Sequence, residues 1–107
     1  PQGLHLVEVK GVTLEDGGHA LFPDAPTERG VRHLRELASA VALGHRATVF
    51  FVIQMAEVTD FAPNDATHPA FGEALRQAVA AGVQAAAYTC RVTPDSIVMD
   101  RPVPVIL

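Results

Sequence analysis

The sequence predicts an α/β protein in which a mixed β-sheet is flanked by two main helices. In the segment 4–10 the pattern has a period of two residues, as in a strand, because Leu4, Leu6, Glu8 and Lys10 alternate with His5, Val7 and Val9. In Thr27–Leu43 apolar side chains recur every three to four residues, as in a helix. The run Ala47–Gln54 is almost wholly apolar and rich in residues that favour strands, as expected of a central strand covered on both faces. The complete order of predicted elements, β-β-β-α-β-α-β-β, is typical of a sheet with helices packed against it.

Turn and cap residues mark the elements in the first half of the chain. Val12–Leu14 and Ala20–Phe22 are short apolar runs on either side of an Asp-Gly-Gly loop, and they predict a hairpin. The prolines that follow predict the start of the long helix, with Asp24 or Thr27 as the residue that caps its free N–H groups. Gly44 is predicted to end this helix, because glycine readily adopts the left-handed conformation found after helices.

The second half of the chain is predicted to add one helix and further strands. Met55–Thr67 is predicted to be a loop because it carries Pro, Asn and Asp in succession. Pro69–Ala81 is predicted to be a helix that its proline opens. Val83–Val92 is predicted to be a strand, followed after a turn by Ser96–Met99. Pro102–Leu107 contains two prolines and is therefore expected to be an edge strand or an extended segment.

The composition favours a folded domain and argues against several functional classes. Apolar residues make up 49% of the chain, too many for a disordered protein. With one cysteine the chain has no internal disulfide, no apolar run is long enough to span a bilayer, and nothing resembles a signal peptide. A cytoplasmic protein without membrane association is therefore expected.

The net charge of −4 speaks against a general nucleic-acid binder, whose surface is usually basic. Residues 29–46 nevertheless hold four arginines and one acid, and this basic helix face either contacts phosphates or is simply solvated.

Glu8 and Lys10 are the strongest candidates for a functional site. They lie two residues apart at the end of a predicted strand, so their side chains point to the same face, about 6.6 Å apart along the backbone. A carboxylate and an ammonium at this spacing can hold a divalent metal and steer the water that it activates. The alternative is a solvated ion pair of little energetic value. Lys10 is the only lysine of the chain, and sites are often built at strand ends, so both observations favour a functional role.

Four consecutive motifs resemble those of a known family. They are Glu-Val-Lys at 8–10, Val-Thr-Leu at 12–14, Phe-Pro-Asp-Ala-x-Thr-Glu-Arg-Gly at 22–30 and His-Leu-x-Glu-Leu at 33–37. The pattern is similar to that of the sugar fermentation stimulation protein A (SfsA) family, and GHRA, FFVIQ, AGVQAAAY and PVPVIL later in the chain also fit. The resemblance covers essentially the whole chain, and the block from 22 to 37 is its most specific part.

The resemblance implies a DNA-binding protein in two parts, an OB-like N-terminal domain and a C-terminal domain with a restriction-endonuclease-like, PD-(D/E)xK core. Residues 1–107 would be most of the second domain. Because the chain begins at Pro1 without a methionine, we expect the N-terminal domain and the first part of the core to be absent from it. In such nucleases an Asp on the strand before Glu-x-Lys completes the metal site, and no residue from Pro1 to Val7 is acidic.

The resemblance further implies roles for individual residues. Glu8 would bind Mg²⁺ or Mn²⁺, and Lys10 would orient or deprotonate the attacking water during hydrolysis of DNA. The residues expected to contact DNA phosphates are Arg29, Arg32 and His33. The residues expected to shape the start of the helix are Asp24, Thr27 and Glu28. Without the resemblance, these six residues are better explained as helix caps, dipole partners, and solvent-facing or packed helix residues.

Three functional classes remain open. The first is a DNA endonuclease that depends on Mg²⁺ or Mn²⁺. The second is a non-catalytic, sequence-nonspecific DNA-binding regulatory protein linked to sugar (maltose) metabolism, as the family name suggests. The third is a structural or interaction domain, which the acidic net charge keeps open and which is favoured if neither DNA nor metal binds. Neither the preferred DNA nor the oligomeric state follows from the sequence.

Overall fold

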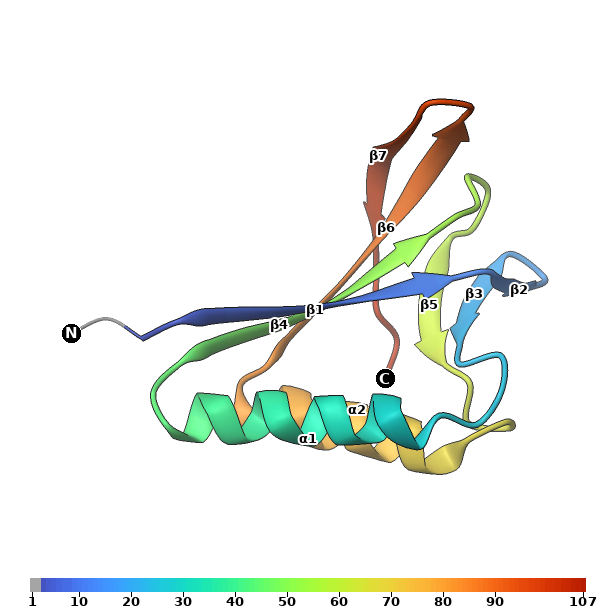
Figure 1. The fold of residues 1–107 in the computed structure, drawn as a ribbon. Coiled ribbons are helices and arrows are strands. Elements are labelled where there is room, and N and C mark those ends of the chain that lie inside the picture. Colours follow the sequence, from blue (N-terminus) through green and yellow to red (C-terminus); the bar gives the residue numbers. More distant parts are fainter. Residues whose placement is uncertain (1–2) are drawn as a thin grey trace.

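A computed structural model describes residues 3–107 and arranges them as two β-sheets and two helices (Figure 1). The elements in chain order are β1 (His5–Val12), β2 (Leu14–Asp16), β3 (His19–Phe22), α1 (Glu28–Ala42), β4 (Arg46–Ile53), β5 (Asp60–Pro63), α2 (Pro69–Ala81), β6 (Gln84–Thr93) and β7 (Ser96–Val103). The larger sheet has the order β1-β4-β6-β7 and the smaller one β2-β3-β5. Each sheet combines parallel and antiparallel pairs. The predicted mixed α/β fold class is confirmed.

Both helices cover the same face of the larger sheet, and they lie side by side beneath it in Figure 1. Their buried side chains include Leu34 of α1 and Leu75 of α2. Within residues 3–107 no helix lies on the opposite face, where Val7 is 54% exposed and Phe50 and Val52 are only half-buried. β4 is an interior strand of the sheet, as predicted, but the expectation that it is covered on both faces is wrong for the described part of the chain.

Aromatic contacts join the smaller sheet to the larger one and to α2. The ring of Phe61 in β5 stacks on Phe51 in β4 with 4.2 Å between the ring centroids. Phe22 in β3 meets Phe71 in α2 edge-on, with 5.1 Å between the centroids. Stacked and edge-to-face arrangements are the favourable geometries for such rings. Phe51, Phe61 and Phe71 are fully buried, so one hydrophobic core extends from the helices to the smaller sheet.

The predicted hairpin is formed by β2 and β3. Asp16 and His19 are the last register partners, and Gly17 and Gly18 form the loop with φ angles of 59° and 89°. Two positive φ angles in a two-residue loop match the twist of the flanking strands, and glycine adopts them without steric cost. The Asp-Gly-Gly signal in the sequence therefore located this turn correctly.

The sequence prediction missed β5, which lies in the segment 55–67 predicted to be a loop. Its four residues are too few to show a clear alternation, and they include Pro63, which weakens any strand prediction. β5 pairs in parallel with β3, where His19 and its partner Asp60 are 41 positions apart. Burial of Phe61 in the core fixes this pairing, and such tertiary packing overrides local propensity.

The end of the chain agrees with its prediction. Pro102 lies in β7, which is the outermost strand of the larger sheet. An edge strand pairs on one side only, so it tolerates a proline, which has no backbone N–H to donate. Neither α1 nor α2 is long and apolar enough to cross a membrane.

Cys90 is buried in β6, and its reactivity is a first testable consequence of the fold. Burial raises the pKa of the Cys90 thiol, and the negative charge of Asp100 raises this pKa further. Because the thiolate is the reactive species, the folded protein is expected to react with a thiol reagent at least about tenfold more slowly than the protein in denaturant. Absorbance of the coloured product with Ellman's reagent measures both rates. Equal rates would show that Cys90 is accessible in the folded state.

Candidate functional site

β1 points Glu8 and Lys10 to the face of the larger sheet that the helices cover. Their register partners in β4 are Val49 and Phe51, which are fully buried, so both side chains lie beside the hydrophobic core. The Nζ atom of Lys10 lies 3.2 Å from Oε1 of Glu8, and the two side chains are 12% and 32% exposed. The acid and the amine are thus paired as the strand periodicity predicted, and the pair is partly shielded from water.

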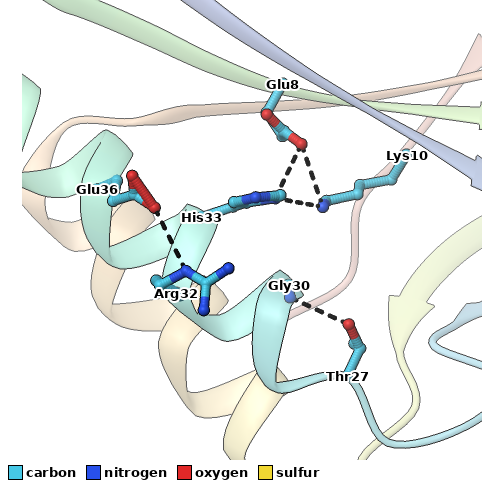
Figure 2. A network of polar contacts seen from close by, with 7 residues as sticks. All are labelled: Glu8, Lys10, Thr27, Gly30, Arg32, His33 and Glu36. Carbon is cyan, nitrogen blue, oxygen red and sulfur yellow. Dashed lines mark hydrogen bonds and ion pairs between the residues drawn. The ribbon is translucent and has the colours of Figure 1, made fainter.

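α1 adds His33 to this pair (Figure 2). The helix starts at Glu28 because the hydroxyl of Thr27 accepts a hydrogen bond from the backbone N–H of Gly30 at 3.0 Å. Further along the helix, Nδ1 of His33 lies 2.9 Å from Oε1 of Glu8 and 2.9 Å from Nζ of Lys10. These three atoms form a closed triangle, which we call the Glu8–Lys10–His33 cluster.

The cluster combines three different hydrogen-bonding groups. The ionised carboxylate of Glu8 only accepts, the ammonium of Lys10 only donates, and Nδ1 of His33 does either, depending on its tautomer. Both contacts of the carboxylate use Oε1, so Oε2 has no polar partner among the described residues. A carboxylate oxygen is a ligand suited to Mg²⁺ or Mn²⁺. Residues 3–107 contain no group of three or more His, Cys, Asp and Glu side chains arranged to hold a metal. Within the cluster, Oε2 of Glu8 is the oxygen available to a metal.

Arg32 lies outside the cluster, although it is adjacent to His33 in sequence. Its Nε atom is 3.8 Å from Oε1 of Glu36, and the two side chains are 66% and 65% exposed (Figure 2). Arg32 also lines a cavity of about 430 Å³ between the starts of α1 and α2. Arg29 is exposed on α1 and makes no ion pair with another described residue. Of the three residues predicted to contact phosphates, the structure brings only His33 to Glu8 and Lys10.

The residues predicted to shape the start of the helix occupy that region. Thr27 caps α1, and its backbone N–H donates to Nδ1 of His68, the residue that precedes α2, at 3.1 Å. Glu28 lies in the first turn of α1, where its negative charge is favourable near the positive end of the helix dipole. Asp24 is exposed, and Thr27 is the residue that acts as the cap. Thr27 and Glu28 therefore have structural roles that account for their positions.

A second ionic contact lies in the smaller sheet. Nδ1 of His19 in β3 is 2.7 Å from Oδ1 of Asp60, its register partner in β5. The hydrogen bond with Asp60 and then the charge of Asp60 raise the pKa of His19 above its ordinary value of 6.5. Because the pKa is raised in the folded state, protonated His19 stabilises the fold. This contribution is fully present below pH 6.5 and is lost as the pH rises through the raised pKa.

His19→Gln is therefore expected to lower the melting temperature at about pH 5.5 and to change it little at about pH 9. Thermal unfolding followed by circular dichroism at both pH values checks this expectation. Asp60→Asn is the matched control, because it removes the same contact from the other strand and should show the same pH dependence. A decrease of equal size at both pH values would contradict a role for the charged pair.

Comparison with known proteins first identifies the class of domain. The family model described as "Sugar fermentation stimulation protein RE domain" matches residues 2–96. A sugar fermentation stimulation protein homolog from Desulfitobacterium hafniense (strain Y51) is 64% identical over 92 residues, which cover 86% of this chain and 40% of the relative. A homolog from Geobacter sulfurreducens is 54% identical over 100 residues, which cover 94% of this chain and 43% of the relative. The chain belongs to the sugar fermentation stimulation protein (SfsA) family, which confirms the family indicated by the motifs.

A solved structure agrees with this assignment. It is described as the structure of Pyrococcus furiosus SfsA in complex with Ca²⁺, and it matches with a TM-score of 0.89 and 31% sequence identity. The match covers 96% of this chain and 45% of that one. The fold is thus that of an SfsA protein and is consistent with the nuclease-like core that the resemblance implied. The chain spans less than half the length of these relatives.

Proposed function

We propose that this chain carries the Glu-x-Lys part of a site that hydrolyses DNA phosphodiesters with Mg²⁺ or Mn²⁺. The observation that carries the proposal is the Glu8–Lys10–His33 cluster, in which a carboxylate with one free oxygen lies beside the only lysine of the chain. The matching family model is described as an RE domain, and a relative is described in complex with Ca²⁺, a divalent cation. Both descriptions support a metal-dependent site.

The residues of the cluster fit a metal ion in part. Mg²⁺ usually binds one or two carboxylates and completes its octahedral shell with waters and substrate phosphates. Oε2 of Glu8 supplies one such ligand. The resemblance implies a second carboxylate, an Asp on a strand before Glu-x-Lys, and residues 1–7 contain no acid. In this proposal the second ligand comes from the part of the family's proteins that lies outside these 107 residues.

The chain's own residues divide the remaining tasks. A bound metal would polarise the phosphate and lower the pKa of the attacking water. Lys10 lies beside Glu8 and would orient this water or accept its proton. Only the neutral amine could accept the proton; as an ammonium, Lys10 would instead orient the water and stabilise the negative charge that develops on the phosphate oxygens. Arg29 and Arg32, whose exposed guanidinium groups lie on α1, would contact phosphates further along the DNA.

Nicking of supercoiled plasmid by the intact protein tests the proposal. Nicking is expected with Mg²⁺ or Mn²⁺, is expected to stop with EDTA, and should fall at least about 100-fold in Glu8→Gln. Glu73→Gln is the matched control, because it neutralises an exposed carboxylate of α2 outside the cluster and should nick like the wild type. Undiminished nicking by Glu8→Gln would rule out the proposed site.

A second candidate is a DNA-binding regulatory protein without turnover, linked to sugar metabolism as the family name suggests. The specific observation in its favour is the exposure of Arg29 and Arg32 on α1, whose guanidinium groups can bind phosphates without a metal. Gel-shift experiments at several salt concentrations distinguish this function. Binding that weakens steeply with salt, together with no cleavage under any metal, would select it over the nuclease.

A further inference from the structure

The two oxygens of the Glu8 carboxylate have different surroundings. Oε1 contacts Nζ of Lys10 at 3.2 Å and Nδ1 of His33 at 2.9 Å. Oε2 has no polar partner within residues 3–107. A carboxylate held through one oxygen keeps its plane and its second oxygen in a defined direction, and such outer contacts commonly orient metal ligands. The contacts of Oε1 therefore determine where Oε2 points.

His33 is the member of the cluster that can fix Lys10, because its Nδ1, when unprotonated, accepts a hydrogen bond from Nζ. A lysine side chain has a flexible stem and three rotatable donors, so one ion pair with Glu8 does not fix its nitrogen. The contact of 2.9 Å with Nδ1 of His33 gives Nζ a second fixed neighbour. His33 itself is 21% exposed and stands on α1 next to Leu34, which is fully buried against the core. The ring is thus anchored by a packed helix, whereas Lys10 has only its flexible stem.

We propose that His33 is a positioning residue: its Nδ1 accepts a hydrogen bond from Nζ of Lys10, and Nζ in turn donates to Oε1 of Glu8, so that Oε2 of Glu8 stays directed to the metal. This role differs from the phosphate contact that the resemblance implied for His33. The inference rests on the proposed function, because it assigns Oε2 to the metal. The part of the inference that concerns the protein alone is that His33 fixes Lys10. This part can be measured without metal and without DNA.

Two substitutions separate the polar contact from the shape of the side chain. Asparagine and leucine branch at the same atom and have nearly the same shape, but only asparagine carries polar atoms near the position of Nδ1. His33→Asn is therefore expected to keep the cluster together, and His33→Leu to release it. Thermal unfolding of both variants verifies that they fold, so that a loss of structure is not mistaken for a loss of positioning.

Lys10 provides a direct signal, because it is the only lysine of the 107 residues. In the chain of 107 residues, labelling of lysine with ¹³C at Cε gives one side-chain NMR signal, which belongs to Lys10. We expect His33→Leu to move this signal toward that of free lysine and to narrow it, and His33→Asn to leave it close to the wild-type position. An unchanged signal in folded His33→Leu would overturn the positioning role.

Calorimetric titration of the intact protein with Mn²⁺ tests the link to the metal. His33→Leu is expected to weaken Mn²⁺ binding by about 10- to 100-fold, as is typical when a contact to a metal ligand is removed, and His33→Asn by less than about threefold. Equal Mn²⁺ affinity of wild type and His33→Leu would overturn the inference while leaving the proposed function intact. Absence of Mn²⁺ binding by the wild type would instead overturn the metal site of the proposed function, and with it the assignment of Oε2. The Lys10 signal would then still decide whether His33 fixes the amine.

Discussion

Replacement of Phe51 by alanine is expected to lower the free energy of unfolding by about 3–5 kcal/mol. Phe51 is fully buried in β4, stacks on Phe61 of the smaller sheet and lies within 6.5 Å of Phe71 of α2, measured between ring centroids. Removal of this ring leaves a cavity where the larger sheet, the smaller sheet and α2 meet, and a packed core closes such a cavity only in part. Urea unfolding followed by circular dichroism measures the loss.

Phe50→Ala is the matched control for this prediction. Phe50 is the adjacent residue of the same strand, but it points to the opposite face, where it is half-buried and stacks on Tyr88 with 5.2 Å between centroids. Its removal costs contacts on one side only, and about 1–2 kcal/mol is expected. If the two substitutions destabilise the protein equally, the described helices do not define the main hydrophobic core.

Lys10→Met is expected to reduce the rate of metal-dependent DNA nicking by about two to four orders of magnitude, the usual contribution of a group that transfers or steers a proton. Methionine preserves the length of the side chain and removes its charge. The variant should retain its fold, because Lys10 lies at the edge of the core and is replaced by an apolar side chain. Plasmid nicking under single-turnover conditions measures the chemical step.

Arg76→Met serves as the control for the Lys10 variant. Arg76, in the middle of α2, forms an exposed ion pair with Asp65 and is not part of the Glu8–Lys10–His33 cluster. Its replacement removes one positive charge, as Lys10→Met does, and should leave nicking within about threefold of the wild type. A Lys10→Met protein that nicks DNA as fast as Arg76→Met would remove Lys10 from the mechanism.

Local chemistry was sufficient to predict the two helices and the first hairpin. Thr27 caps α1, Pro69 opens α2, and Gly82 ends α2 with a φ angle of 113°, each within a residue or so of the predicted boundary. These signals depend on backbone N–H groups and φ angles of neighbouring residues, so the sequence displays them directly. The pairing of β5 with β3 has no such local signal, because a buried ring from a distant part of the chain determines it.

The placement of both helices on one face follows from strand order, which the sequence does not display. The strands β1, β4 and β6 are parallel and adjacent in that order. In the chain α1 lies between β1 and β4, and α2 lies between β4 and β6, so both connections move across the sheet in the same direction. Crossovers of the usual right-handed kind then put both helices on the same side. The interior position of β4 was predictable from its composition, whereas the exposure of Phe50 and Val52 was not.

The residues that β1 contributes to the candidate site were predictable from the sequence, whereas the residue that α1 contributes was predictable only in part. The period of two residues placed Glu8 and Lys10 on one face, and the structure pairs them. His33 reaches them only because α1 packs over β1, a tertiary contact. One available signal was overlooked: consecutive helix residues are rotated by about 100°, so Arg32 and His33 face different flanks of α1.

The confinement of Lys10 has a practical consequence for the chemistry of this chain. Acylating reagents and formaldehyde attack ε-amines, and these 107 residues offer such reagents a single ε-amine, whose side chain is 12% exposed. The rate at which Lys10 is modified thus measures how often Nζ loses its contacts with Glu8 and His33. A ligand that covers Nζ would slow this rate, so mass spectrometry of the peptide that contains Lys10 would report its binding.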